Sequence, residues 1–152
     1  MDIKKTANSF ANFTIKRIAE IFGITVFCAG VLLLLALITY SPEDPNFIFP
    51  ENTKIENILG FQGSFVSDVF FQSIGLVSYF FSFTLIVTGI NIIRSKEFFL
   101  IIENIFFAII YCIFGTLFFA HFYSEAFTLY INGNGGFIGA YLNQSFLNSI
   151  IL

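Results

Sequence analysis

Charged residues are scarce in this chain, and tryptophan is missing altogether. Only 11% of the 152 residues are charged, whereas 57% are hydrophobic. A soluble domain usually has about 25% charged residues. A shortage of this size leaves too few polar side chains to coat a globular surface, so lipid must be the solvent for much of the protein. The composition excludes an ordinary soluble domain and predicts an integral membrane protein.

The sequence also lacks the patterns on which most catalytic and metal sites depend. Its single histidine, His121, can build neither a zinc site of three or four ligands nor a Ser-His-acid triad. Cys28 and Cys112 lie in separate apolar stretches and are interpreted as small packing residues. There is no G-x-x-x-x-G-K-[ST] phosphate loop, and a net charge of −3 does not favour nucleic acid. We therefore expect no catalytic residue, cofactor, metal or nucleic-acid contact in this chain.

Three long apolar runs are present instead, at about residues 21–40, 69–93 and 98–123. About 20 helical residues, rising about 1.5 Å each, span the hydrocarbon core of a bilayer. Pro42 ends the first run because it lacks an N–H group and disfavours helical geometry at the preceding residue. The pattern predicts a polar N-terminus over residues 1–17 and an all-α membrane domain over residues 18–152, with membrane lipid around it.

Small side chains form one stripe along the second run and another along the third. In lipid, such stripes allow helix backbones to approach closely, because packing replaces the hydrophobic driving force. We expect them to mediate helix packing and homo-oligomerisation. The stripes consist of Gly75, Ser78, Ser82 and Gly89 in the second run, and of Ala108, Cys112 and Gly115 in the third.

Basic residues are distributed unevenly between the connecting segments. Lys54 is the single basic residue of the acidic segment after the first run, and no Lys or Arg follows the third run. By the positive-inside rule, the N-terminus is therefore predicted to be cytoplasmic, in a bacterial inner membrane. The remaining basic residues precede the first run or separate the second from the third: Lys4, Lys5, Lys16, Arg17, Arg94 and Lys96.

An internal repeat is also indicated. The segment Gly60–Phe65 matches Gly136–Tyr141 as a G-F-x-G turn, and the same offset aligns Ile74 with Ile150. Each copy is interpreted as a turn, an amphipathic helix and then a membrane span. The second copy reaches Leu152 before its span, so residues 137–152 are expected to be an amphipathic segment leading into a missing or truncated fourth helix.

Three ionisable residues, Asp68, Glu103 and His121, lie near the ends of the apolar runs. One interpretation is interfacial, with the side chains snorkelling or pairing with headgroups, and with Glu103 pairing with Arg94 or Lys96. The other is a proton or ion pathway, since ionisable groups in a membrane are expensive to desolvate. The second interpretation would suit a complete small polytopic protein, such as a transporter or channel subunit. A stand-alone envelope scaffold is a third alternative.

Several motifs, in order along the chain, resemble those of the FtsK/SpoIIIE family of DNA translocases. The segment from Tyr40 to Pro45 resembles the Y-S-P-x-D-P motif that ends the first membrane helix in this family. Leu59–Gly63 resembles the L-G-x-x-G before the second helix, and Gly135–Gly139 the G-G-x-x-G before the fourth. The matching positions are Tyr40, Ser41, Pro42, Asp44, Pro45, Gly60, Gly63, Gly135, Gly136 and Gly139.

The resemblance implies a membrane region of about four helices, followed in the parent protein by a linker and a RecA-like motor. ATP and Mg would belong to that motor, which this chain lacks. By resemblance, the membrane region would anchor the translocase at the division septum among divisome proteins, coupling cell division to chromosome segregation. The chain itself would contribute position and assembly, not catalysis.

Overall fold

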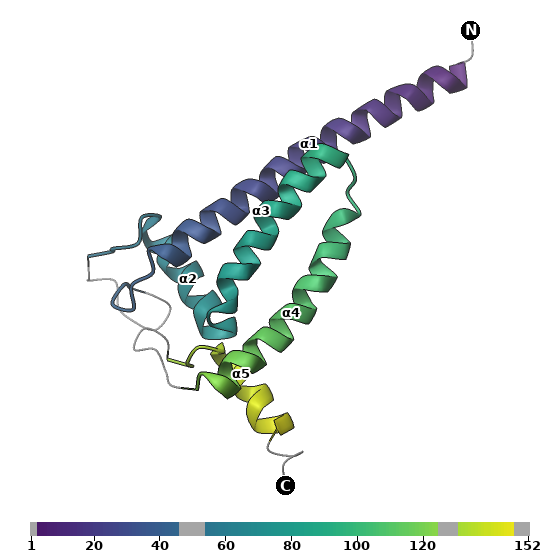
Figure 1. Ribbon diagram of the computed structural model, residues 1–152. Helices are drawn as coiled ribbons and strands as arrows, with labels where there is room; N and C mark the ends of the chain where they lie inside the picture. Colours follow the sequence, from purple (N-terminus) through teal and green to yellow (C-terminus); the bar gives the residue numbers. More distant parts are fainter. Residues whose placement is uncertain (1–2, 46–53, 125–130, 148–152) are drawn as a thin grey trace.

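A computed structural model of the protein describes residues 3–45, 54–124 and 131–147. Within these ranges the chain forms helices joined by turns, without a strand (Figure 1). This arrangement confirms the predicted all-α membrane fold. The elements are α1 (Ile3–Ile38), α2 (Gly60–Ile74), α3 (Val77–Ser95), α4 (Leu100–Phe122), α5 (Gly136–Leu142) and a π-helical turn η1 (Asn143–Leu147).

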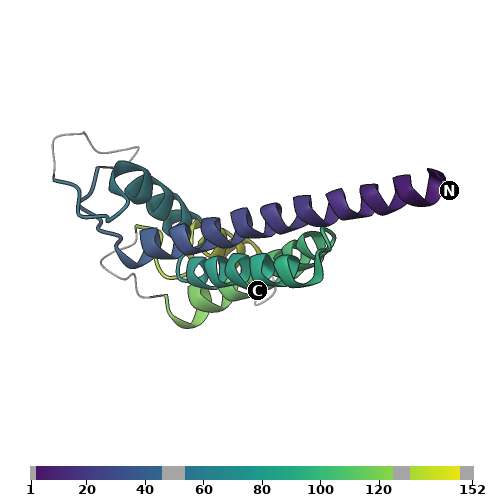
Figure 2. The ribbon, with the colours of Figure 1, turned by 90° about the horizontal axis from the view of Figure 1, so that it is seen from above.

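Three of these helices, α1, α3 and α4, are long and apolar enough to cross a membrane. Helix α1 has 36 residues, which corresponds to about 54 Å at about 1.5 Å per residue and exceeds the hydrocarbon thickness. Its N-terminal part projects beyond the other helices (Figure 2). From Ile3 onwards the predicted polar N-terminal segment is helical and continues without a break into the membrane-length helix.

The expected second span is wrong at its beginning. Hydropathy predicts its start at residue 69, but residues up to Ile74 belong to α2, and the membrane-length helix α3 begins at Val77. Gly75 separates the two helices with φ of +57°. This left-handed conformation is open to glycine at little cost, so the chain turns there while remaining apolar. Hydropathy alone could not reveal the break.

Helices α1 and α3 lie side by side and antiparallel, and glycines bring their backbones together (Figure 1). A Cβ atom added at Gly89 of α3 would lie 2.5 Å from the Phe27 backbone nitrogen. One added at Gly30 of α1 would lie 2.8 Å from the Ile86 nitrogen. Such close approach increases dispersion contacts between the helices, which is the main source of helix association in lipid.

Helix α4 diverges from α3 and leaves a groove of about 1050 Å³ between them. Two polar contacts still join the helices across this groove. The hydroxyls of Thr84 and Tyr111 lie 2.8 Å apart, and Asn104 Nδ2 donates to Thr88 Oγ1 at 2.9 Å. In lipid these groups have no water to bind, so pairing with each other satisfies them.

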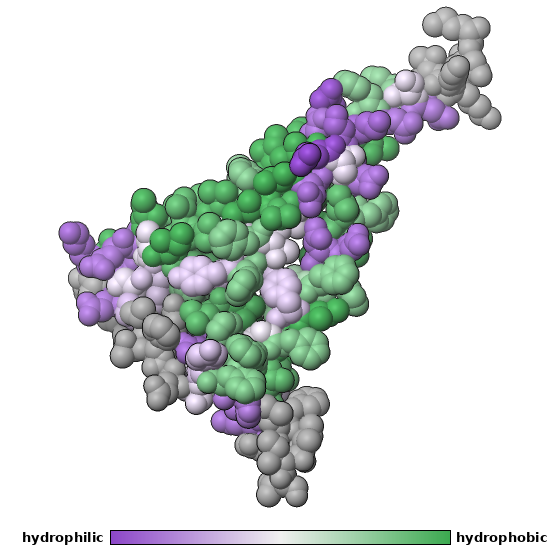
Figure 3. Space-filling model, in the orientation of Figure 1, coloured by the Kyte–Doolittle hydropathy of each residue, from purple (hydrophilic) through white to green (hydrophobic). Residues whose placement is uncertain are grey.

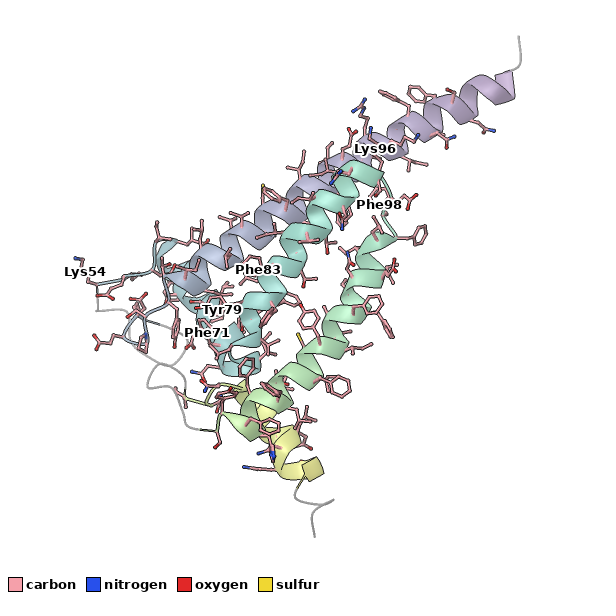
Figure 4. All side chains as sticks on the ribbon, in the orientation of Figure 1. Lys54, Phe71, Tyr79, Phe83, Lys96 and Phe98 are labelled. Carbon is pink, nitrogen blue, oxygen red and sulfur yellow. The ribbon has the colours of Figure 1, made fainter. Side chains whose placement is uncertain are left out.

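The surface is divided along the length of the bundle (Figure 3). A broad apolar zone covers the membrane-length helices, and hydrophilic residues gather toward its two ends. Lys96, at the end of α3, and Lys54, in the segment before α2, lie at opposite ends of the bundle (Figure 4). This distribution suits a protein that crosses a bilayer and meets water on both sides.

Candidate functional site

The motif after α1 folds into a compact connection with α2, here called the α1–α2 junction (residues 40–45 and 54–64). Asp44 is its central residue, with only 1% of its surface exposed. Its Oδ1 accepts a hydrogen bond from the Glu56 backbone N–H at 2.7 Å, and its Oδ2 accepts one from the Asn57 N–H at 2.9 Å. Both carboxylate oxygens therefore hold the segment that leads into α2 against the end of α1.

Asn57 continues this connection toward α1. Its Nδ2 donates to the Ala36 carbonyl at 2.9 Å, while its Oδ1 accepts from the Leu59 N–H at 3.0 Å. Gly63 packs beneath it, and a Cβ atom there would overlap the Asn57 side-chain oxygen. The second glycine of the L-G-x-x-G motif is therefore required, because a side chain would not fit at this position.

Pro45 and Ser64 hold the other side of α2 in place. Pro45 is buried, and its carbonyl accepts a hydrogen bond from the Ser64 hydroxyl at 3.1 Å. Ser41 is half-buried and Pro42 is exposed, in a turn where the Asp44 N–H donates to the Ser41 carbonyl at 3.3 Å. The motif therefore acts as a rigid link between two helices.

An aromatic cluster fills the space below the junction, between α1, α2 and α3. Phe71 is fully buried, with its ring centroid 4.9 Å from that of Tyr40 and 5.5 Å from that of Tyr79 (Figure 4). The Tyr79 hydroxyl donates to the Leu37 carbonyl at 3.3 Å, and the Tyr40 hydroxyl donates to Asp68 Oδ1 at 3.0 Å. The polar tips of both tyrosines are thereby satisfied within a buried apolar cluster.

A second close contact joins the two halves of the chain at Gly75 and Gly136. Leu76 N–H donates to the Asn134 carbonyl at 2.9 Å. A Cβ atom on Gly136, where φ is +63°, would lie 2.6 Å from the Gly75 nitrogen. Glycine is needed at Gly136 for two reasons, the left-handed backbone and the lack of space.

The rest of the G-G-x-x-G motif seats α5 on α4. Both Gly135 and Gly139 face the Thr116 carbonyl, and a Cβ atom on Gly135 would lie 2.5 Å from it. Thr116 is itself fully buried. This motif is thus a close-packing surface, and it differs from the phosphate-binding glycine loops by having no basic side chain beside it.

The predicted small-residue stripes occupy different positions in the fold. Ser78, Ser82 and Gly89 are buried, and Gly89 faces α1. Gly75 lies outside α3, at the end of α2. In α4, Ala108 is buried, Cys112 is half-buried and Gly115 faces Val77 of α3. The stripe of α3 therefore has a partner within its own chain, and an oligomer would need another surface.

The three ionisable residues do not come together. Asp68 is buried and bonded to Tyr40, which differs from the interfacial, snorkelling position predicted for it. His121 is exposed, with its Nδ1 3.3 Å from Asn143 Oδ1, and Glu103 is exposed on α4. Within residues 3–45, 54–124 and 131–147, no group of His, Cys, Asp or Glu side chains could hold a metal ion.

The expected pairing of Glu103 with Lys96 is also replaced by a different contact. Lys96 Nζ lies 2.8 Å from Glu20 Oε1, and Arg17 binds the other oxygen of the same carboxylate. This group ties the end of α3 to α1, as Figure 4 shows for Lys96. Glu20 immediately precedes the first apolar run, so pairing at the end of the span satisfies its charge without burying it.

The sequence analysis did not identify several glycines and several polar and aromatic residues that complete these contacts. A lone asparagine between apolar segments carries no pattern of its own, and its role depends on backbone groups distant in sequence. Gly23 and Gly30, seven residues apart on α1, did offer a signal, since that spacing returns to the same helix face. The missed residues are Gly23, Gly30, Asn57, Ser64, Phe71, Tyr79, Thr116 and Asn134.

The motifs, the three membrane-length helices and the helical connections can now be compared with known proteins. Residues 15–151 match the family model of the 4TM region of DNA translocase FtsK/SpoIIIE. The chain belongs to the FtsK/SpoIIIE 4TM family. It is therefore a multi-pass membrane protein of the bacterial inner membrane, and the resemblance seen in the sequence is confirmed.

Curated relatives agree with this assignment. The DNA translocase FtsK of Rhizobium meliloti (strain 1021) is 26% identical over 98 residues, which is 64% of this chain and 11% of that protein. That of Caulobacter vibrioides is 35% identical over 79 residues, 52% of this chain and 10% of that protein. That of Azospirillum brasilense is 28% identical over 87 residues, 56% of this chain and 14% of that protein. No solved structure gives a significant match.

The matched stretch is a small part of each FtsK relative, between 10% and 14% of its length. The family therefore describes the membrane region of these translocases. The motif residues of the α1–α2 junction, Gly60, Gly63 and the glycines of α5 all lie within the matched range.

Proposed function

We propose that this chain is the membrane anchor of a DNA translocase and directs it to the division septum. The observation that carries the proposal is the match of residues 15–151 to the membrane region of the FtsK/SpoIIIE translocases. The relatives that share similarity with this chain are the DNA translocases FtsK of three bacteria. The anchor would hold the motor close to the membrane that closes between daughter cells.

The motor itself would belong to the parent protein. ATP and Mg would be its cofactors, and DNA its substrate. The anchor would contribute none of this chemistry. It would fix the position and the stoichiometry of the motor, with divisome proteins as its partners and a homo-oligomer as its working form.

The distribution of charges supports one orientation of the anchor in the membrane. Arg17 and Lys96 bind the same Glu20 carboxylate, and Arg94 lies in the last turn of α3. Lys54 lies at the opposite end of the bundle (Figure 4). By the positive-inside rule, the N-terminal end would face the cytoplasm. A fourth span would then return the chain to the cytoplasm, where a motor could reach the chromosome.

The positions of the ionisable residues suit a membrane anchor more than a transporter. Asp68 is bound to Tyr40, His121 and Glu103 are exposed, and neither α3 nor α4 is interrupted by proline or by a glycine of positive φ. A transport path would need ionisable groups near the middle of a broken helix. The polar contacts described here instead tie helices to one another.

The proposal is tested by replacing residues 1–152 of the full-length protein with an unrelated membrane anchor that has four spans and cytoplasmic ends. Fluorescent fusions report septal location, and DNA-stimulated ATP hydrolysis of the purified protein reports the motor. The expected result is loss of septal location with the motor activity retained. Septal location that survives the replacement would overturn the proposal.

A further inference from the structure

Helix α2 has its polar side chains turned inward and its apolar side chains turned outward. Ser64, Ser67 and Asp68 are buried, whereas Phe61 and Val69 are each 45% exposed. A helix on the surface of a water-soluble protein shows the opposite arrangement, with its apolar side chains against the core. The arrangement indicates that the medium outside α2 is apolar.

The inward polar groups of α2 are satisfied within the chain. Ser67 Oγ donates to the Gly63 carbonyl at 2.8 Å, and Asp68 accepts a hydrogen bond from the Tyr40 hydroxyl. The other side of the helix is left for contact with its surroundings. We call this side the apolar face of α2, in which Phe65 is half-buried and the other members are exposed. It consists of Phe61, Phe65, Val66 and Val69.

Helix α5 has the same arrangement. Its buried residues, Gly136 and Gly139, pack against α2 and α4, while Phe137 and Tyr141 are each 61% exposed. The rings of Phe137 and Tyr141 are stacked with centroids 6.3 Å apart, and the aromatic pair in the apolar face of α2 is stacked at 6.4 Å. Both short helices therefore carry a stacked aromatic pair. The apolar face of α5 consists of Phe137, Ile138 and Tyr141.

The contacts at both ends of α2 determine where it lies along the bundle. Asn57, just before α2, binds the Ala36 carbonyl, close to the end of α1 at Ile38. At its other end, α2 leads through Gly75 into α3, which begins at Val77. Both ends of α2 are therefore held at the ends of membrane-length helices.

The length of α3 shows how deep in the membrane these ends lie. Its 19 residues correspond to about 28 Å at about 1.5 Å per residue, close to the hydrocarbon thickness of about 30 Å. Arg94 and Lys96 lie at its far end, and charged groups are costly to bring into hydrocarbon. With that end at one interface, Val77 lies at the other, and α2 lies beside it.

The contacts of α5 place it at the same end of the bundle. Asn134, just before α5, donates from its Nδ2 to the Tyr123 carbonyl at the end of α4, at 3.1 Å. Gly139 packs against the Thr116 carbonyl, within the last two turns of α4. Figure 1 shows α2 and α5 together at the end of the bundle away from the N-terminus. Their apolar faces therefore adjoin the lipid-facing surface of the spans.

We propose that α2 and α5 lie in the interface of one leaflet, at the end of the bundle opposite Lys96, with their apolar faces among phospholipid acyl chains. Helices that lie in a membrane interface bury one apolar face at the boundary between headgroups and acyl chains. Gln62, which is exposed beside Phe61, and the hydroxyl of Tyr141 suit that boundary, where apolar and polar surroundings meet. The proposal does not depend on septal targeting, because an anchor whose short helices stood in water could still reach the septum.

The charges of the two helices indicate which part of the lipid they contact. Helices α2 and α5 carry no Lys or Arg, and their one acidic residue, Asp68, is buried. An anionic headgroup therefore finds no charge to pair with, and vesicles of phosphatidylcholine alone should suffice. A docking surface for a water-soluble protein would have to stay in water when unoccupied, which large apolar patches disfavour.

The absence of tryptophan from residues 1–152 allows the use of single reporters. In the full-length protein, with any tryptophan outside these residues replaced by phenylalanine, Phe61→Trp and Phe137→Trp report on the two apolar faces. Glu56→Trp is the control, at an exposed position that precedes α2 at the same end. Leu32→Trp, at a position 51% exposed within the α1 span, is the deep reference. Each variant is reconstituted in phosphatidylcholine vesicles brominated either near the headgroup or near the ends of the acyl chains.

Bromine quenches tryptophan on contact, so the lipid that quenches most reports the depth of the side chain. We expect Phe61→Trp and Phe137→Trp to be quenched several-fold more than Glu56→Trp, and most by bromine near the headgroup. Leu32→Trp should be quenched most by bromine near the chain ends. Quenching of both faces by aqueous iodide instead, equal to that of Glu56→Trp, would place them in water and overturn the proposal. Bromine quenching that appears only on dilution in lipid would show that a second copy covers the faces, and would overturn it as well.

A thiol measurement keeps the proposal falsifiable if tryptophan disturbs the packing. Val69→Cys and Ile55→Cys are each made the only cysteine of the full-length protein, at positions that are 45% and 36% exposed. N-ethylmaleimide crosses membranes and reacts with the thiolate, which forms poorly in apolar surroundings. In the same vesicles Val69→Cys should react several-fold more slowly than Ile55→Cys, and in SDS both should react alike. Equal rates in the vesicles would overturn the proposal.

Discussion

Asp44 shows how a single polar residue can determine the geometry of a membrane protein. Its two carboxylate oxygens accept from two successive backbone N–H groups, of Glu56 and Asn57, in a site closed to solvent. Buried N–H groups without a partner are costly, so the segment before α2 is held where these bonds can form. The aspartate of the Y-S-P-x-D-P motif therefore has a structural role in this chain.

We predict that Asp44→Asn lowers the free energy of unfolding by about 1.5–3 kcal/mol, because the amide group offers one acceptor oxygen where two are needed. Unfolding in mixed micelles with increasing SDS measures the change. Glu56→Gln is the matched control, since it removes the same charge from an exposed side chain and keeps the backbone N–H that Asp44 binds. Equal losses in the two variants would contradict the assigned role.

A comparison of Gly133 with Gly136 separates two reasons why a position can require glycine. One is a left-handed backbone, and the other is a lack of space for a side chain. Gly133 has φ of +74° and nothing within 4 Å of an added Cβ, whereas Gly136 has φ of +63° and lies against Gly75. Gly133→Ala should therefore lose about 1–2 kcal/mol from backbone strain alone. Gly136→Ala should lose about 3 kcal/mol, because the steric overlap adds to the strain.

The same unfolding measurement checks this pair. Similar losses in Gly133→Ala and Gly136→Ala would mean that the contact between the two halves contributes little. A larger loss in Gly136→Ala alone would identify the crossing with Gly75 as a stabilising contact between the repeats.

At the scale of helices, the glycines of α1 and α3 decide how closely these elements pack. Alanine favours a helix over glycine by about 1 kcal/mol where nothing else changes. At Gly89, alanine should instead destabilise the protein, because its Cβ atom would lie 2.5 Å from the Phe27 nitrogen and 2.7 Å from the Gly23 oxygen. Backbone atoms cannot give way as side chains do, so the helices would have to separate.

We predict that Gly89→Ala destabilises the protein by about 1–3 kcal/mol. Gly115→Ala is the matched control, because its Cβ atom would meet only the Val77 side chain, at 3.1 Å, and the gain in helix propensity opposes the small displacement. SDS-induced unfolding followed by circular dichroism distinguishes the two. A stabilised Gly89→Ala variant would contradict the close backbone contact between α1 and α3.

At the scale of the whole molecule, two halves of similar construction pack against each other. In each half a membrane-length helix is followed by a short helix that begins at a glycine turn, α1 by α2 and α4 by α5. One contact between the halves is the hydrogen bond from the Leu76 N–H to the Asn134 carbonyl. A parallel repeat of this kind places both short helices at the same end of the bundle, as Figure 1 shows for α2 and α5. That end therefore holds most of the family motifs.

The charge asymmetry between the two ends predicts the orientation in the membrane. In a Cys28→Ala, Cys112→Ala background, Ile55→Cys and Glu97→Cys place single thiols on exposed residues at opposite ends. A membrane-impermeant maleimide added to intact spheroplasts should label Ile55→Cys and reach Glu97→Cys only after lysis. These substitutions leave every Lys and Arg in place, so the positive-inside signal is unchanged. The reverse labelling pattern would contradict a cytoplasmic N-terminus.

The apolar composition, with its three long runs, determined the all-α membrane fold without reference to any contact. A chain with few charges can satisfy its backbone in lipid only by forming helices or a closed barrel, and uninterrupted runs of this length favour helices. The sequence also carried the family motifs and the repeat of G-F-x-G turns. Hydropathy is a local property, so it could be read directly along the chain.

Tertiary structure alone decided where the second span begins and what the motif residues do. Gly75 lies in a continuous apolar run, and its left-handed turn is required by the contact with Gly136, 61 residues away. Contacts with other elements give three polar residues a structural role, because their hydrogen-bond partners are backbone groups and side chains elsewhere in the fold. These residues are Asp44, Asn57 and Asp68. Contacts between residues far apart in sequence leave no periodic pattern, so they could not be predicted from the sequence. Hydropathy therefore predicted the helices, whereas contacts between the helices determined where the chain turns and how the helices join.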